Sequence, residues 1–110
     1  MLQVTPILSD DSGVAGIEIE LTEERWNHIT KEHPEIKTHY EKIGDVLSAP
    51  DQVKLSKRDE NVFLYYRFYH DIQSGKYLLI VVKKDQERSF VLTGYITDAI
   101  RKGDTIWERK

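Results

Sequence analysis

The chain contains no cysteine, only 3 prolines and no apolar run near the roughly 20 residues that a membrane-spanning helix requires. Without cysteine it can form neither disulfides nor thiolate zinc sites, and it has no thiol nucleophile. Met1 to Ser12 contain two acids and no lysine or arginine, unlike the basic start of a secretory signal. These absences predict a soluble, cytoplasmic protein without a membrane partner, whose chemistry must come from other side chains.

The length and composition predict a single folded domain. A chain of 110 residues with 39% hydrophobic and 10% aromatic residues can bury one core but not two. Residues 1–13 lack periodicity and end in the turn-forming sequence DDSG. We therefore expect an N-terminal arm over residues 1–16 and one domain over residues 17–110.

The net charge of -3 is unevenly distributed. Residues 1–52 carry 4 Lys/Arg and 11 Asp/Glu, whereas residues 53–110 carry 12 Lys/Arg and 8 Asp/Glu. Because screening limits electrostatic reach to about 8–10 Å at physiological salt, a polyanion responds to the local surface and not to the total charge. The second half can therefore form a cationic face, although scattered, solvated lysines explain the same counts.

Two helices are predicted before residue 50. Thr22 is a suitable N-cap for the first, which must end near His33 because Pro34 disfavours helical geometry in the residue before it. Pro34 can itself begin a second helix. The apolar residues of that helix follow helical spacing: Ile36, Tyr40, Ile43 and Leu47. Ala49-Pro50-Asp51 ends it.

After residue 51 the apolar period changes from about 3.6 to 2, which is typical of strands. Strands are predicted over residues 52–56, 61–70, 76–84 and 89–97, joined by short polar turns. Residues 16–21 also alternate and suit a short extended segment. The order of elements predicts an α+β fold with two N-terminal helices packed on a four-stranded antiparallel sheet. Trp107, in the tail, is expected to anchor at the edge of the sheet.

Histidine is the most versatile proton carrier in this sequence. His28 and His33 are five residues apart, which puts them about 140° apart around a helix, so they do not form a metal-ligand pair. The sequence has no HExxH motif, and we expect neither a metal nor another cofactor. An imidazole can act as a general acid or base at neutral pH. The alternative is that both histidines are surface or boundary residues of the helices.

The strands supply hydroxyls and cations. Thr93, Tyr95 and Thr97 share one face of the last strand, where they can position a phosphate or simply reflect high β-propensity. Arg67 lies beside Tyr66 in the middle of an aromatic strand, where a guanidinium can hold a phosphate or pair with an acid from the helices. Lys83 ends the neighbouring strand.

These residue types match the needs of metal-free RNA cleavage. A base takes the proton of the ribose 2′-OH, a cation stabilises the charged phosphorane, and an acid protonates the leaving 5′-oxygen. Tyrosines beside the cation can stack unpaired bases.

Three segments carry a family resemblance: ERWNHI at 24–29 followed by HPE at 33–35, VLSAPD at 46–51, and FVLTGYIT at 90–97, preceded by the run 77–84. They resemble the phage and prokaryotic barnase–EndoU–colicin–RelE-like nuclease domains over about residues 17–107. The resemblance implies a RelE/barnase-like fold and endoribonuclease activity, often as a toxin that acts on mRNA or tRNA beside a small antitoxin protein. It implies His28 or His33 as the helix histidine, Arg67 or Lys83 as the basic strand residue, and Thr93 and Thr97 as the hydroxyls.

The sequence thus predicts a toxin-type endoribonuclease. Its expected catalytic residues are His28 or His33, Arg67, Lys83 and Thr93, and its expected substrate-binding residues are Tyr66, Tyr95 and Thr97. A non-catalytic module that binds nucleic acid or protein through the same sheet face is the alternative.

Overall fold

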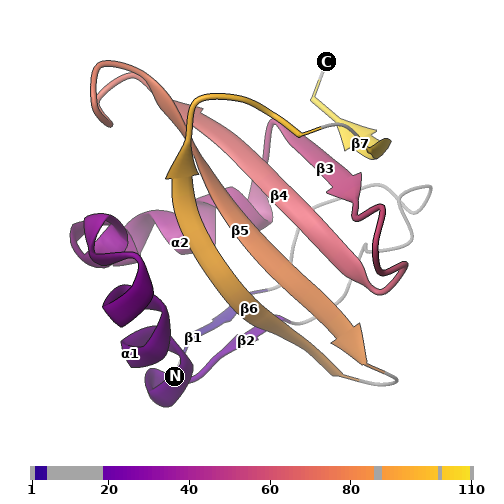
Figure 1. The fold of residues 1–110 in the computed structure, drawn as a ribbon, viewed down its shortest axis with the longest axis horizontal. Helices are drawn as coiled ribbons and strands as arrows, with labels where there is room; N and C mark the ends of the chain where they lie inside the picture. Colours follow the sequence, from indigo (N-terminus) through magenta and orange to yellow (C-terminus); the bar gives the residue numbers. More distant parts are fainter. Residues whose placement is uncertain (1, 5–18, 86–87, 102, 110) are drawn as a thin grey trace.

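One twisted sheet organises the chain, with the helices on one of its faces (Figure 1). The computed structural model describes residues 2–4, 19–85, 88–101 and 103–109. The elements are β1 (Leu2–Val4), β2 (Ile19–Leu21), α1 (Glu23–Glu32), a 3-10 helix η2 (Pro34–His39), α2 (Tyr40–Ser48), β3 (Gln52–Leu55), β4 (Val62–Tyr69), β5 (Lys76–Asp85), β6 (Arg88–Thr97) and β7 (Asp104–Glu108). The α+β class predicted from the sequence is confirmed.

The long central strands match their predicted positions. β4, β5 and β6 form an antiparallel meander in which Tyr66 lies opposite Leu79, and Leu79 lies opposite Tyr95. Their ends differ from the predicted ends by at most one residue. These strands are marked by a dense aromatic and β-branched composition, and the central one, β5, is buried on both faces.

The predicted sheet of four antiparallel strands is wrong. In the described residues the sheet has seven strands in the order β1-β2-β6-β5-β4-β3-β7, and β2 pairs with β6 in parallel. β1, β2 and β7 are only three to five residues long, so they carry little periodicity and depend on long-range pairing. β1 falls in the expected arm, most of which lies outside the described residues. The tail forms β7, and Trp107 packs there against the core.

The first predicted helix agrees closely with the structure, whereas the second, predicted to begin at Pro34, is α-helical only from Tyr40. The Thr22 side chain accepts a hydrogen bond from the Arg25 amide at 3.1 Å, which caps α1. α1 ends at His33, whose own amide donates to the Ile29 carbonyl. The expected second helix begins at Pro34 as η2 and becomes α-helical at Tyr40. Among the described residues, no helix is long and apolar enough to cross a membrane.

Two clusters of buried side chains lie on opposite faces of the sheet. The helices cover one face with residues such as Ile29, Ile36 and Val46, which pack against Leu78 and Ile80 of β5. On the other face a smaller cluster surrounds three buried side chains: Tyr66, Leu79 and Val81. We call this second side the open face because no helix of the described chain lies on it.

Arg67 lies on the helix-covered face and fastens the end of α2 to the sheet. Its guanidinium donates to the Ala49 carbonyl at 2.7 Å, and Arg109 donates to the same oxygen at 2.6 Å. Arg109 also lies 3.6 Å from the carboxylate of Asp51. The carbonyls at the end of a helix have no partners within the helix, so two cations satisfy one of them and complement the helix dipole.

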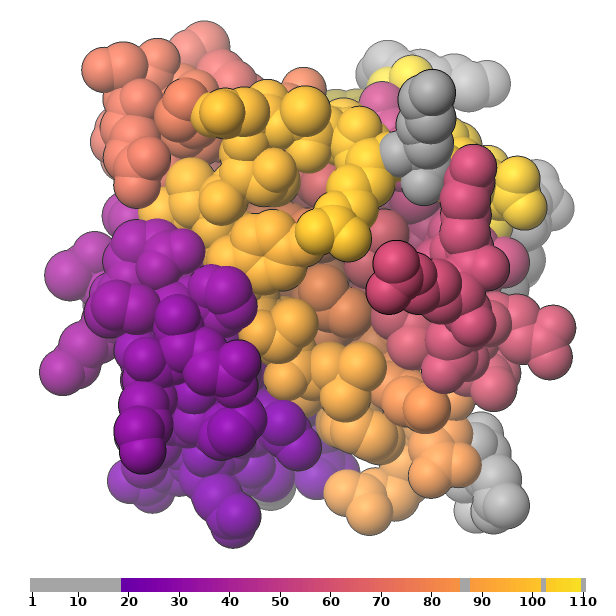
Figure 2. Space-filling model, in the orientation of Figure 1, coloured from indigo at the N-terminus to yellow at the C-terminus, as the bar shows by residue number. Residues whose placement is uncertain are grey.

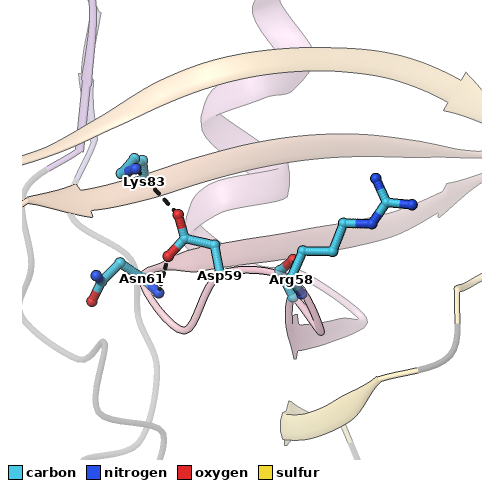
Figure 3. Close-up of polar contacts among 5 residues, drawn as sticks. Arg58, Asp59, Asn61 and Lys83 are labelled. Atoms are coloured by element: carbon cyan, nitrogen blue, oxygen red, sulfur yellow. Dashed lines mark hydrogen bonds and ion pairs between the residues drawn. The ribbon is translucent and has the colours of Figure 1, made fainter.

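We expect Arg67→Met to lower the free energy of unfolding by about 1–3 kcal/mol, the range for a lost hydrogen bond that involves a charged group. Urea denaturation measures this. Arg58→Met is the matched control, because the Arg58 guanidinium points away from Asp59 and is expected to change stability by less than about 0.5 kcal/mol (Figure 3). Equal stability of the two variants would contradict a clamping role for Arg67.

Candidate functional site

The open face gathers most of the side chains that the sequence predicted to be functional. The β4–β5 and β5–β6 registers put these residues on the same side as buried Leu79 and Val81: Tyr66, Lys83, Thr93, Tyr95 and Thr97. In Figure 2 the strands lie recessed between the helix residues in indigo and violet and the pink residues around the β3–β4 turn. The face is therefore a shallow basin with raised sides.

The segment that follows β6 folds back over the middle of this face. Ile100 packs on the open-face cluster, and the Arg101 amide donates to the Tyr66 hydroxyl at 3.1 Å. Burial raises the pKa of Tyr66, so its hydroxyl stays protonated at neutral pH. Tyr66 is 0% exposed, which contradicts its predicted role as a base-stacking platform. Its ring supports the segment that carries Arg101.

His33 is the histidine that reaches the open face. Because α1 ends at His33, its ring turns back against the sheet and stacks on Tyr95 with the ring centroids 5.2 Å apart and an interplanar angle of 28°. The Arg101 guanidinium lies 6.0 Å from the centroid of the same tyrosine ring. His33 Nδ1 lies 3.7 Å from a Glu35 carboxylate oxygen, which orients the imidazole and directs Nε2 away from Glu35. We call His33, Tyr95, Arg101 and Tyr66 the His33 cluster.

His28 lies elsewhere. Its side chain is 60% exposed, and its Nε2 lies 2.7 Å from the Glu32 carboxylate on the next turn of α1. The open depression around it is lined within the described chain by α1 and its N-cap alone, through Thr22, Glu24, Arg25, Asn27, His28 and Lys31. Of the two histidines left open by the sequence, only His33 contacts another candidate site residue.

Arg67 does not lie on the open face with the His33 cluster, in contrast to its predicted catalytic role. It projects to the helix-covered face, where it binds the Ala49 carbonyl and lies 5.6 Å from the ring centroid of Tyr69. Alternation along β4 explains this position, because Arg67 follows Tyr66 and must point to the opposite side. The ion pair with a helix acid, which was the alternative to a phosphate site, is replaced by a contact with the Ala49 carbonyl at the end of α2.

Lys83 lies at the other end of the open face. Its amine contacts the Asp59 carboxylate at 3.2 Å, while the second Asp59 oxygen accepts the Asn61 amide at 2.9 Å (Figure 3). These contacts lower the pKa of Asp59, the Asn61 amide having the larger effect. Lys83 is four positions along β5 from Leu79, the partner of Tyr95, which corresponds to roughly 13 Å. Lys83 therefore lies some distance from His33 and belongs to the other end of the open face.

The two threonines differ in availability. Thr93 lies opposite Val81 on the open face, between Tyr95 and the Lys83 end of the strand pair. The Thr97 hydroxyl donates to the Ala99 carbonyl at 3.2 Å and accepts from the Ala99 amide, so it shapes the turn after β6. Thr93 is the better placed hydroxyl for a bound phosphate.

The sequence did not reveal Arg101 as a site residue. It lies in an aperiodic tail, and no strand alternation relates it to His33. Charge alone gave a weak signal, because Arg101 belongs to the net-basic second half. Within the described ranges, no three His, Asp or Glu side chains gather in a way that could hold a metal ion.

Comparisons of the chain with protein-family models, with curated proteins and with solved structures found no match.

The contribution of the Asp59 contacts to stability can be tested by changing the pH. A carboxyl group whose pKa is lower in the folded state contributes stability above its unfolded pKa, near 3.8, and loses that contribution as the pH falls below it. We expect Asp59→Asn to lower the midpoint of thermal unfolding slightly at pH 7, and the difference from the native chain to shrink as the pH falls through the lowered pKa of Asp59. Thermal unfolding followed by circular dichroism between pH 7 and 2.5 measures this. A difference that stays constant over this range would contradict it.

Proposed function

We propose that the protein is a metal-independent endoribonuclease that cleaves RNA on its open face. One observation carries this proposal: an imidazole, from His33, and a guanidinium, from Arg101, lie on the same tyrosine ring. A proton acceptor and a cation within one cluster are the minimum that cleavage by the ribose 2′-OH requires. The earlier resemblance to RelE-like nucleases supports the same reaction class.

The proposed reaction is an internal displacement. His33 accepts the proton of the 2′-OH, the 2′-oxygen bonds to phosphorus, and the bond from phosphorus to the 5′-oxygen breaks. Arg101 stabilises the negative charge that grows on the phosphoryl oxygens. The leaving 5′-oxygen takes a proton from water, so the products are a 2′,3′-cyclic phosphate and a 5′-hydroxyl. Thr93 and Lys83 contact the RNA backbone further along β5 and β6.

We expect His33→Ala to reduce cleavage of a fluorogenic RNA oligonucleotide by about a hundredfold or more, the usual contribution of a general base. His28→Ala is the matched control, since His28 is exposed on α1, and its activity should stay within a few-fold of the native chain. Comparable losses in the two variants, or full activity of His33→Ala, would refute the role of His33. An intact chain that binds RNA but leaves it uncut would instead be the binding module. The toxin role rests on this same activity.

The reaction also has a chemical signature. Because the proposed chemistry uses only side chains and the ribose hydroxyl, EDTA should leave the rate unchanged. A single 2′-deoxy substitution at the cleaved nucleotide should abolish cleavage there. Mass spectrometry of the fragments should detect the 2′,3′-cyclic phosphate. Linear 5′-phosphate products would point to attack by water and contradict this mechanism.

A further inference from the structure

A line of aromatic rings continues from the His33 cluster to the β4–β5 turn. Tyr77 meets Tyr66 edge-on at a centroid distance of 6.2 Å and meets Phe68 at 5.3 Å. Phe68 in turn meets His70 at 5.0 Å with the rings nearly perpendicular. Phe68 lies opposite Tyr77 in the strand register, so both rings belong to the open face.

Phe68 is held in place and yet remains accessible. It is 36% exposed, and among the described residues only Tyr40 is a comparably exposed large apolar side chain. The turn fixes its outer edge: a methyl group added at Gly75 would lie 3.0 Å from the tip of the ring, and the positive φ of 114° at this residue also favours glycine. The ring is therefore a positioned, solvent-facing surface.

We infer that Phe68, Tyr77 and His70 form a second subsite that stacks an unpaired nucleobase of the bound RNA. Phe68 and Tyr77 carry no charge, so the subsite suits a base better than a phosphate. Aromatic side chains bind bases by stacking without a need for charge, whereas Arg101 supplies the cation for the backbone. The inference rests on the proposed function insofar as both put RNA on the open face.

The spacing of the two subsites defines the substrate as single-stranded. Two strand spacings of about 4.8 Å and two residues of rise separate Phe68 from Tyr95, which corresponds to about 12 Å. A few nucleotides can bridge this distance. In a duplex the bases are stacked inside the helix and cannot lie on a ring of the protein, so the Phe68 subsite can be filled only by unpaired RNA while the His33 cluster holds the backbone.

The test measures binding apart from cleavage. A fluorescently labelled RNA octamer is titrated with chains that carry His33→Ala, and the dissociation constant is read from anisotropy. Adding Phe68→Leu, which keeps an apolar side chain but removes the ring, should weaken binding by roughly fivefold to a hundredfold. Phe68→Tyr, which keeps an aromatic ring, should bind the octamer as tightly as the chain that carries His33→Ala alone. Tyr40→Leu is the matched control, because Tyr40 is 37% exposed but packs edge-on against Trp26 on the helices.

The outcomes separate this inference from the proposed function. Unchanged octamer binding by a folded Phe68→Leu chain, or equal weakening by Tyr40→Leu, would overturn the subsite. Equal affinity for the octamer and for its blunt duplex would overturn it as well. If the native chain cleaves nothing but Phe68→Leu still loses affinity, the nuclease proposal fails and the subsite stands. If the native chain cleaves RNA and Phe68→Leu leaves octamer affinity unchanged, the nuclease proposal stands and the subsite alone fails.

Discussion

Burial of β5 on both sides is the constraint on which the rest of the structure depends. Leu78 and Ile80 face the helices, while Leu79 and Val81 face the other way, and all four are nearly or fully inaccessible. A strand covered on both faces needs a second cover where no helix is present. The segment after β6 supplies part of that cover, and the same segment carries Arg101. The cationic part of the candidate site is therefore a by-product of completing the core.

The His33 cluster joins residues that are far apart in the chain. His33 ends a helix, Tyr95 belongs to a late strand and Arg101 follows it, so the cluster exists only after the sheet has formed. The ends of secondary-structure elements position His33 and Arg101. Pro34 ends α1 at His33, and the turn after Thr97 reverses the chain before Arg101. Closing such loops costs entropy that the sheet pairing must offset. Local sequence signals predict where the helix and the strand end, but they do not predict that His33, Tyr95 and Arg101 come together.

Sequence reasoning succeeded where a rule acts over a few neighbouring residues. The cap at Thr22, the break at Pro34 and the central strands follow from local hydrogen bonding and period-2 burial. It failed where pairing partners are distant, as for β7 and the parallel partner of β6. Arg67 shows the limit of reasoning from neighbours in the sequence. Its aromatic neighbours suggested a phosphate site, although strand alternation already puts Arg67 and Tyr66 on opposite faces of the sheet. Arg101 had no periodic context at all and required the folded chain.

The clamp between Arg109 and the end of α2 has a consequence for local opening. β7 is an edge strand, and edge strands usually fray at low free-energy cost. Here Arg109, the residue that follows the strand, is tied to Ala49 and Asp51, so release of the chain end must also break these contacts. The backbone that leads into β7 is the one that passes over Tyr66. We therefore expect the amides of β7 and of Arg101 to exchange hydrogen together, because opening of the chain end removes support from the segment that lies on Tyr66.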